Sequence, residues 1–269
     1  MKTIVSSANR SKAGRAVLST PLRQSSSAVD RGAVRTPRPA IRAVRWFTCF
    51  AAGAIALAVV GCATPKLPPP SAGDVAKWEK DIKAFEAHDR TNPPPAGAIL
   101  FIGSSSIRRW TNLHESFPEF QVINRGFGGS HTADSVAFVD RIVIPYHPRE
   151  IIFYAGGNDI NAKKSPEQVA ADFDAFCDRV HAALPDTRIC YVSIAPNPAR
   201  WAQIKQVRRA NQLIRDYARW TRHVEYIDIH PAMLGKDGKP LPDIYVADRL
   251  HMNPKGYAIW EKIIRPYLR

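Results

Sequence analysis

The chain has 269 residues and a net charge of +14 at pH 7, with 38 Lys and Arg against 24 Asp and Glu. Ten of these basic residues, and only one acidic residue, Asp30, lie in residues 1–61, which therefore account for +9 of the charge. The rest of the chain is only mildly basic. This distribution argues against nucleic acid as a partner.

The N-terminal segment has the order of a secretory signal. Scattered arginines are followed by a stretch without charge between Arg45 and Lys66, and its apolar core covers residues 47–60. This core is shorter than the ~20 residues that a membrane-spanning helix needs, and it is typical of the apolar region of a signal peptide. An ordinary signal peptide cut nearby and an uncleaved short anchor are the alternatives.

The apolar core ends in Val-Val-Gly-Cys at residues 59–62, which resembles the bacterial lipobox. The resemblance implies cleavage before Cys62 and a lipid on its sulfur, which would hold the protein at the cell envelope. The following proline-rich stretch is typical of an extended tether. We therefore expect an N-terminal extension with a lipoprotein signal (1–61), a tether (62–72) and one domain of ordinary size (73–269).

From residue 73 onward, helical and apolar segments alternate. A helical pattern at 74–89 comes first, and further helical patterns cover 165–184, 199–220 and 253–268. Continuous apolar runs, typical of strands buried on both faces, occupy 98–102, 121–124, 151–155, 189–194 and 224–229. This alternation predicts an α/β fold in which a parallel sheet of five strands carries helices on both faces.

Two cysteines, Cys177 and Cys190, lie in the predicted domain. An exported compartment permits a disulfide between them, and two separate buried thiols are the alternative. Their spacing matches no metal-binding motif.

Polar and glycine-rich motifs follow the predicted strands, where ligands bind in parallel sheets. Gly-Ser-Ser-Ser at 103–106 follows the first strand, Arg-Gly-Phe-Gly-Gly-Ser-His at 125–131 the second, and Gly-Gly-Asn-Asp at 156–159 the third. Near the C-terminus, Asp248 precedes His251 by three residues, a spacing that lets a carboxylate orient an imidazole. Serine, glycine N–H groups, an asparagine amide and an Asp–His pair are the components of acyl transfer.

These four motifs resemble, in order, those of the SGNH hydrolase (GDSL esterase) superfamily. The resemblance implies a three-layer α/β/α sandwich of flavodoxin-like type and a serine esterase that needs no metal or organic cofactor. It implies Ser105 as the nucleophile, His251 as the base and Asp248 as the residue that orients it. It also implies an oxyanion hole in which Gly129 donates its backbone N–H and Asn158 its side-chain amide.

The serine motif departs from the family pattern. The aspartate that usually precedes the nucleophile is Ser104 here, and Ser104 and Ser106 flank the expected nucleophile. Ser104 is equally suited to cap the following helix. The family register favours Ser105, whereas the residues by themselves do not choose among the three.

Two other polar residues compete for roles. Asp228 also lies near a strand end, but the spacing of three residues favours Asp248 as the partner of His251. His131 follows Gly129 and is interpreted as a loop residue.

The substrate is indicated least clearly. Arg200 and Trp201 follow the fourth strand, where they would line the site, and Trp201 would either stack on a sugar or pack in the core. We expect small acyl esters, acetyl or short-chain, on a carbohydrate or lipid. An O-acyltransferase acting on envelope glycans is one alternative, and a lipid-anchored binding domain without turnover is another.

Overall fold

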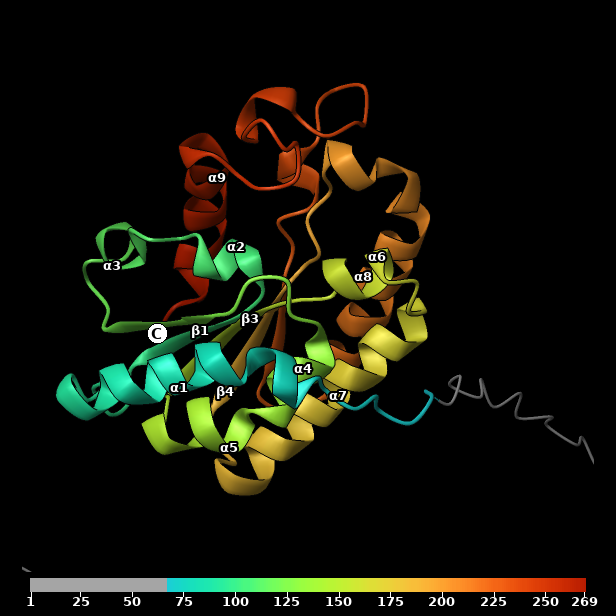
Figure 1. The fold of residues 1–269 in the computed structure, drawn as a ribbon. Coiled ribbons are helices and arrows are strands. Elements are labelled where there is room, and N and C mark those ends of the chain that lie inside the picture. Colours follow the sequence, from blue (N-terminus) through green and yellow to red (C-terminus); the bar gives the residue numbers. More distant parts are fainter. Residues whose placement is uncertain (1–66) are drawn as a thin grey trace, which may run out of the picture. The chain divides into compact units, whose positions relative to one another are not determined.

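The computed structural model describes residues 67–269, and in this part of the chain the strands form a single parallel sheet (Figure 1). The strand order across the sheet is β2-β1-β3-β4-β5. The strands are β1 (Ile99–Gly103), β2 (Val122–Gly126), β3 (Glu150–Tyr154), β4 (Arg188–Val192) and β5 (Val224–Ile227). The predicted five-stranded parallel sheet is confirmed, because each continuous apolar run became a strand.

Helices cover both faces of the sheet, so the predicted three-layer α/β/α architecture is confirmed. Side chains alternate along β1, where Ile99 and Phe101 join one core while Leu100 and Ile102 join the other. The first of these cores is closed by α2 (Ser105–Arg108), α3 (Leu113–Ser116) and α9 (Pro254–Ile264). The second is closed by α1 (Val75–Thr91), α4 (Thr132–Ala137), α5 (Val139–Ile142), α7 (Pro166–Ala183) and α8 (Ile204–Trp220).

Helix α8 begins later than the pattern predicted. Residues 198–203 form a tight 3₁₀ segment, and Arg200 inside it has non-helical dihedral angles. Asn197 caps this segment, because its side-chain oxygen accepts a hydrogen bond from the Arg200 backbone N–H at 2.9 Å. The extra turn holds the Arg200 side chain at the edge of the sheet where the strands end.

The two cysteines of the domain are free thiols. Cys177 lies on α7 in one core, whereas Cys190 lies on β4 in the core on the opposite face of the sheet. Burial raises the pKa of both thiols. Of the two alternatives that the sequence left open, the structure therefore shows buried thiols and no disulfide.

The first described residues are bound to the domain by hydrogen bonds. The backbone N–H and the hydroxyl of Ser71 both donate to the carboxylate of Asp172 on α7, each at 2.6 Å. Asp172 is fully buried, and Lys164 donates to Ser71 Oγ at 2.9 Å and to Asp172 at 3.2 Å. The residues that precede Leu67, including the predicted signal and Cys62, lie outside the described residues. Between 67 and 269 no helix is both long and apolar enough to cross a bilayer.

Candidate active site

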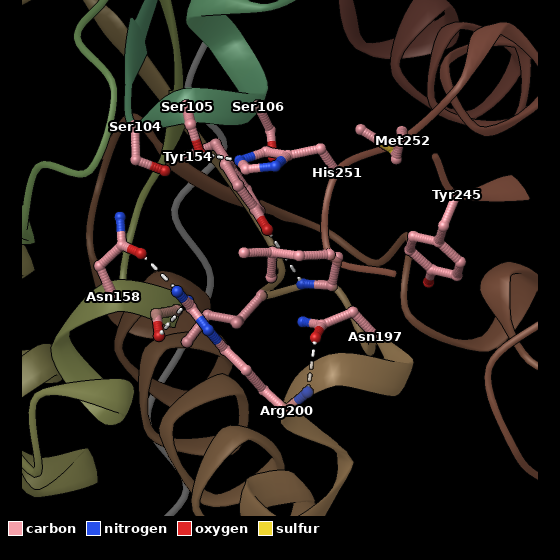
Figure 2. A pocket seen from close by; sticks show the side chains of 14 residues that line it. Ser104, Ser105, Ser106, Tyr154, Asn158, Asn197, Arg200, Tyr245, His251 and Met252 are labelled. Atoms are coloured by element: carbon pink, nitrogen blue, oxygen red, sulfur yellow. Dashed lines mark hydrogen bonds between the residues drawn. The ribbon is translucent and has the colours of Figure 1, made fainter. Parts of the chain in front are cut away.

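Ser105, His251 and Asp248 form a hydrogen-bonded chain above the carboxyl end of β1. His251 Nε2 lies 2.9 Å from Ser105 Oγ (Figure 2), and His251 Nδ1 lies 2.6 Å from Asp248 Oδ2. Because the carboxylate accepts the proton of Nδ1, Nε2 is left as an acceptor for the serine hydroxyl. The arrangement is that of a nucleophile, a base and a group that orients the base.

The loop around His251 holds the carboxylate in place. Asp248 Oδ1 accepts the backbone N–H groups of Leu250 and His251, both at 2.9 Å, so the carboxylate caps the turn that carries the imidazole. The hydrogen bond from His251, followed by these backbone bonds, keeps the pKa of Asp248 well below its usual range. Asp248 is therefore ionised under the conditions in which a histidine base is neutral.

The sharp turn after β1 presents Ser105 to the imidazole. Gly103 has φ +136°, and a Cβ at this position would lie 1.9 Å from the Tyr154 carbonyl oxygen, so only glycine is accommodated. Ser104 occupies the N-cap position of α2, but its side chain makes no capping hydrogen bond. Of the three consecutive serines, it is Ser105 whose hydroxyl lies within hydrogen-bonding distance of His251.

Asn158 lies in the first turn of α6 (Gly157–Asn161), directly after β3. Its Nδ2 donates to the Ser130 carbonyl at 3.1 Å, and its Oδ1 accepts a hydrogen bond from Arg200 at 3.0 Å. An amide nitrogen carries two hydrogens, so one has no acceptor among the described residues, and Asn158 lines the same pocket as Ser105.

The glycine loop after β2 lies against the nucleophile. A Cβ on Gly128 would come within 3.8 Å of Ser105 Cβ, and Gly129, with φ +89°, continues the turn. Among the described residues, no acceptor for the Gly129 N–H is found. The structure therefore brings the expected oxyanion loop beside Ser105.

A buried carboxylate braces the two loops that carry Asn158 and Gly129. Asp159 accepts the Thr132 backbone N–H at 3.1 and 3.2 Å, and Lys164 lies 3.4 Å away. Burial raises the pKa of Asp159, and the cation of Lys164 partly opposes this shift. The Gly-Gly-Asn-Asp motif thus supplies a candidate oxyanion donor and, one residue later, its structural support.

A narrow cavity of about 30 Å³ opens above Ser105 and His251. Tyr154, Tyr245 and Met252 are among the residues that line it, and both tyrosines are more than nine-tenths buried. These three were not predicted. Tyr154 ends β3, so the rule that ligands bind at strand ends signals it, whereas Tyr245 and Met252 come from an irregular segment without a recognisable pattern.

The two residues expected to contact substrate have different positions. Arg200 lines the cavity and is half-buried. Trp201 is not among the lining residues; the guanidinium of Arg208 lies 5.9 Å from the centre of its ring.

The competing polar residues lie elsewhere. Asp228 pairs with Arg215 and accepts the backbone N–H of His230, so its carboxylate is engaged away from His251. His131 is the N-cap of α4. Within residues 67–269, no group of three or more His, Cys, Asp or Glu side chains is arranged to hold a metal ion.

Several known proteins have solved structures with the same fold as this chain. The solved structures that resemble it include a Streptococcus pneumoniae protein provisionally described as a platelet activating factor (23% identity, TM-score 0.64, 72% of this chain and 94% of that one). They also include a GDSL-like lipase from Bacteroides thetaiotaomicron, with 19% identity and a TM-score of 0.59 over 70% of this chain and 96% of that one. A third is an acetyl-xylooligosaccharide esterase from Geobacillus, with 16% identity and a TM-score of 0.52 over 64% of this chain and 94% of that one. No match was found among curated proteins.

The family assignment rests on more than half of the chain. Residues 100–259 match the GDSL-like Lipase/Acylhydrolase family, and this range begins in β1 and ends in α9. It includes Ser105, Asn158 and His251. The chain therefore belongs to the GDSL-like lipase/acylhydrolase family and is a serine ester hydrolase of the SGNH type.

Proposed function

We propose that the protein hydrolyses small acyl esters at the bacterial cell envelope through an acyl-enzyme on Ser105. The observation that carries this proposal is the chain of two short contacts from Ser105 Oγ through His251 to Asp248. A serine hydroxyl is a weak nucleophile until an adjacent base takes its proton, and this geometry supplies such a base.

The reaction proceeds in two halves. His251 Nε2 removes the hydroxyl proton as Ser105 Oγ attacks the ester carbonyl, and the resulting imidazolium is stabilised by Asp248. Collapse of the tetrahedral intermediate breaks the bond to the alcohol, which takes the proton from His251. Water then attacks the acyl-serine as His251 accepts its proton. Collapse of the second tetrahedral intermediate breaks the bond to Ser105 Oγ, which regains the proton from His251 as the carboxylic acid leaves.

Negative charge on the carbonyl oxygen is held by three donors in this proposal. These are the backbone N–H groups of Ser105 and Gly129 and the free Nδ2–H of Asn158. Donors fixed before the reaction stabilise the developing charge without reorganisation, and removal of one typically costs about 2.7–4 kcal/mol. The loops after β1, β2 and β3 each contribute one donor.

The size of the cavity supports a short acyl group. Its volume is only about 30 Å³, and Tyr154, Tyr245 and Met252 form part of its wall. A small space bounded by these side chains favours a short acyl group such as acetyl over a long chain. A structure of the same fold is an acetyl-xylooligosaccharide esterase, which makes an acetylated carbohydrate the first substrate class to test.

Envelope location is supported by the lipobox-like residues 59–62. In this proposal Cys62 becomes the lipidated N-terminus, and the chain from there to Ser71 is the link between membrane and domain. Replacement of Cys62 by Ser should abolish the incorporation of labelled palmitate while the esterase activity is kept. A variant that still incorporated palmitate would argue against lipid attachment at Cys62.

The substrate proposal is tested with p-nitrophenyl esters of increasing chain length, together with acetylated xylooligosaccharides and a short-chain phospholipid. We expect kcat/KM to be highest for the acetyl ester and to fall as the chain lengthens. A maximum of kcat/KM for acyl chains of about eight or more carbons, as expected of a lipase, would contradict the inference from the size of the cavity. Sugar acceptors added to the same assay report on transfer, since acetylated sugar would then appear in place of free acetate.

A further inference from the structure

Arg200 contacts the side chain of Asn158, the candidate oxyanion residue, and the backbone of the preceding residue at the same time. Its Nη1 donates to the Gly157 carbonyl and to Asn158 Oδ1, both at 3.0 Å (Figure 2). The arginine is itself fixed, because Asn197 accepts its backbone N–H. One guanidinium nitrogen therefore joins the segment after β4 to the first turn of α6.

This arginine has no anionic partner in the described part of the chain, where no carboxylate lies within 4.0 Å of its guanidinium. Burial lowers its pKa. A half-buried cation that is paired only with neutral oxygens costs desolvation without the gain of an ion pair. A contribution to stability therefore does not explain a cation at this position, whereas a contribution to the reaction does.

The contact determines which way the Asn158 amide faces. Arginine has five donors and no acceptor, so Asn158 Oδ1 must be the atom turned toward Arg200. From the other side, the Ser130 carbonyl can only accept, so it selects Nδ2. With oxygen and nitrogen each fixed by a partner, the free Nδ2–H is held in one direction.

The cation also changes the strength of the donor. A positive charge hydrogen-bonded to the amide oxygen draws electron density from the nitrogen, and hydrogen bonds connected in this way strengthen one another. The Nδ2–H then binds an oxyanion more strongly than the amide of a free asparagine would.

We propose that Arg200 is a positioning residue that orients and polarises Asn158 for transition-state stabilisation, and that it does not bind the substrate directly. The proposal rests on the proposed function, in which Asn158 donates to the oxyanion. It assigns Arg200 a role different from the substrate contact expected from the sequence.

The test is a double-mutant cycle with Arg200→Met, Asn158→Ala and the combined variant, all measured on p-nitrophenyl acetate. We expect Arg200→Met to lower kcat about 10- to 100-fold, the equivalent of one charge-assisted hydrogen bond, with KM changed less than about threefold. In the Asn158→Ala background the same replacement should have almost no further effect on kcat. Arg200→Lys, which keeps a donor and a charge, should recover part of the loss.

Arg208→Met serves as the matched control, because Arg208 is exposed and lies outside the cavity. It should leave kcat and KM unchanged. Thermal unfolding of each variant separates loss of fold from loss of function.

Two results would overturn the proposal. Losses that multiply in the combined variant would show that Arg200 does not act through Asn158, and a raised KM with an unchanged kcat would show direct substrate binding. A loss of less than tenfold in Asn158→Ala would remove the oxyanion role of Asn158 and this proposal with it. Covalent labelling of Ser105 would still report on the acyl-enzyme independently.

Discussion

The side chain of Asn158 donates to the carbonyl of Ser130 at 3.1 Å, and this bond joins the loops that follow β3 and β2. The strand order places β1 between these two strands, because the chain adds β2 on one side of β1 and β3 and the later strands on the other. Ligands of parallel sheets bind at such a reversal. Ser105, which follows β1, therefore lies between the two loops, and the fold itself assembles the nucleophile and the oxyanion donors from three neighbouring strand ends.

Removal of the Asn158 amide should slow the reaction without unfolding the protein. We expect Asn158→Ala to lower kcat by about two to three orders of magnitude, because one preorganised oxyanion donor is lost. Steady-state kinetics on a short-chain ester measure the change, and circular dichroism checks the fold. A decrease of less than tenfold would exclude Asn158 as an oxyanion donor.

Replacement of Asp248 by Asn should remove the charge that stabilises the imidazolium. An amide also fails to hold the required tautomer of His251, so kcat should decrease by as much as about 10⁴-fold. The Ser105 hydroxyl remains in place, so substrate binding should change little. Activity within tenfold of the original would indicate that another group orients His251.

The same variant has a predicted pH dependence of stability. The folded-state pKa of Asp248 is depressed by its bond to His251, so the stabilisation is fully present above the unfolded pKa of about 3.9 and is lost as the pH falls through the folded value. Asp248 is exposed, and the difference in unfolding free energy should be about 1 kcal/mol or less. Urea unfolding at pH 7, 5 and 3.5 should show this difference shrinking only at the lowest pH. A difference that does not shrink between pH 5 and pH 3.5 would contradict the assignment.

Ser71 should contribute to the stability of the whole domain. Ser71→Ala removes one hydrogen bond to the buried carboxylate of Asp172 and one acceptor of Lys164, and we expect a loss of about 1–3 kcal/mol. Gln212→Ala, on the exposed side of α8, is the control and should stay within about 0.5 kcal/mol. Urea unfolding of the two variants and of the original protein measures these changes in unfolding free energy. Equal stability would mean that Ser71 is only loosely associated with α7.

Gly156, which lies two residues before Asn158, should not tolerate a larger side chain. It has φ +106°, and a Cβ there would lie 2.8 Å from Ile194 Cδ1, so Gly156→Ala should destabilise the protein and displace Asn158. Gly238→Ala is the matched control, since φ is +71° but no atom lies within 4 Å. The control should lose about 1–2 kcal/mol and keep its kcat, whereas Gly156→Ala should lose more stability and most of its kcat. Similar kinetics in both variants would show that the turn is not needed for catalysis.

Local patterns predicted most of the fold. Each continuous apolar run became a strand because both faces of the sheet are covered. The helical pattern over 165–184 became the helix Pro166–Ala183, which the structure shows to be capped by Ser165 and to have a proline in its first turn. The motifs after β1 and β3 and the Asp-x-x-His motif near the C-terminus predicted a site formed by Ser105, Asn158 and His251, and the structure places these residues around one cavity. Strand ends in a parallel sheet meet at one edge, so residues far apart in the chain are brought together.

Other features depend on tertiary contacts that no local pattern records. Tyr245 and Met252 enter the cavity wall through an isolated antiparallel bridge between them, in a segment without periodic apolar residues. Ser71 lies in a proline-rich stretch that suggests only a tether, yet it binds a carboxylate a hundred residues away. The contact between Arg200 and Asn158 likewise joins two loops whose separation in space the sequence does not give.

Covalent labelling tests the central claim that His251 activates Ser105. The purified full chain is treated with a fluorophosphonate, and the modified peptide is identified by mass spectrometry in the original protein and in Ser105→Ala, Ser104→Ala and His251→Ala. We predict a single adduct on Ser105 that persists in Ser104→Ala and is lost in the other two variants. An adduct on Ser104 or Ser106, or one on Ser105 that forms equally fast without His251, would contradict the account.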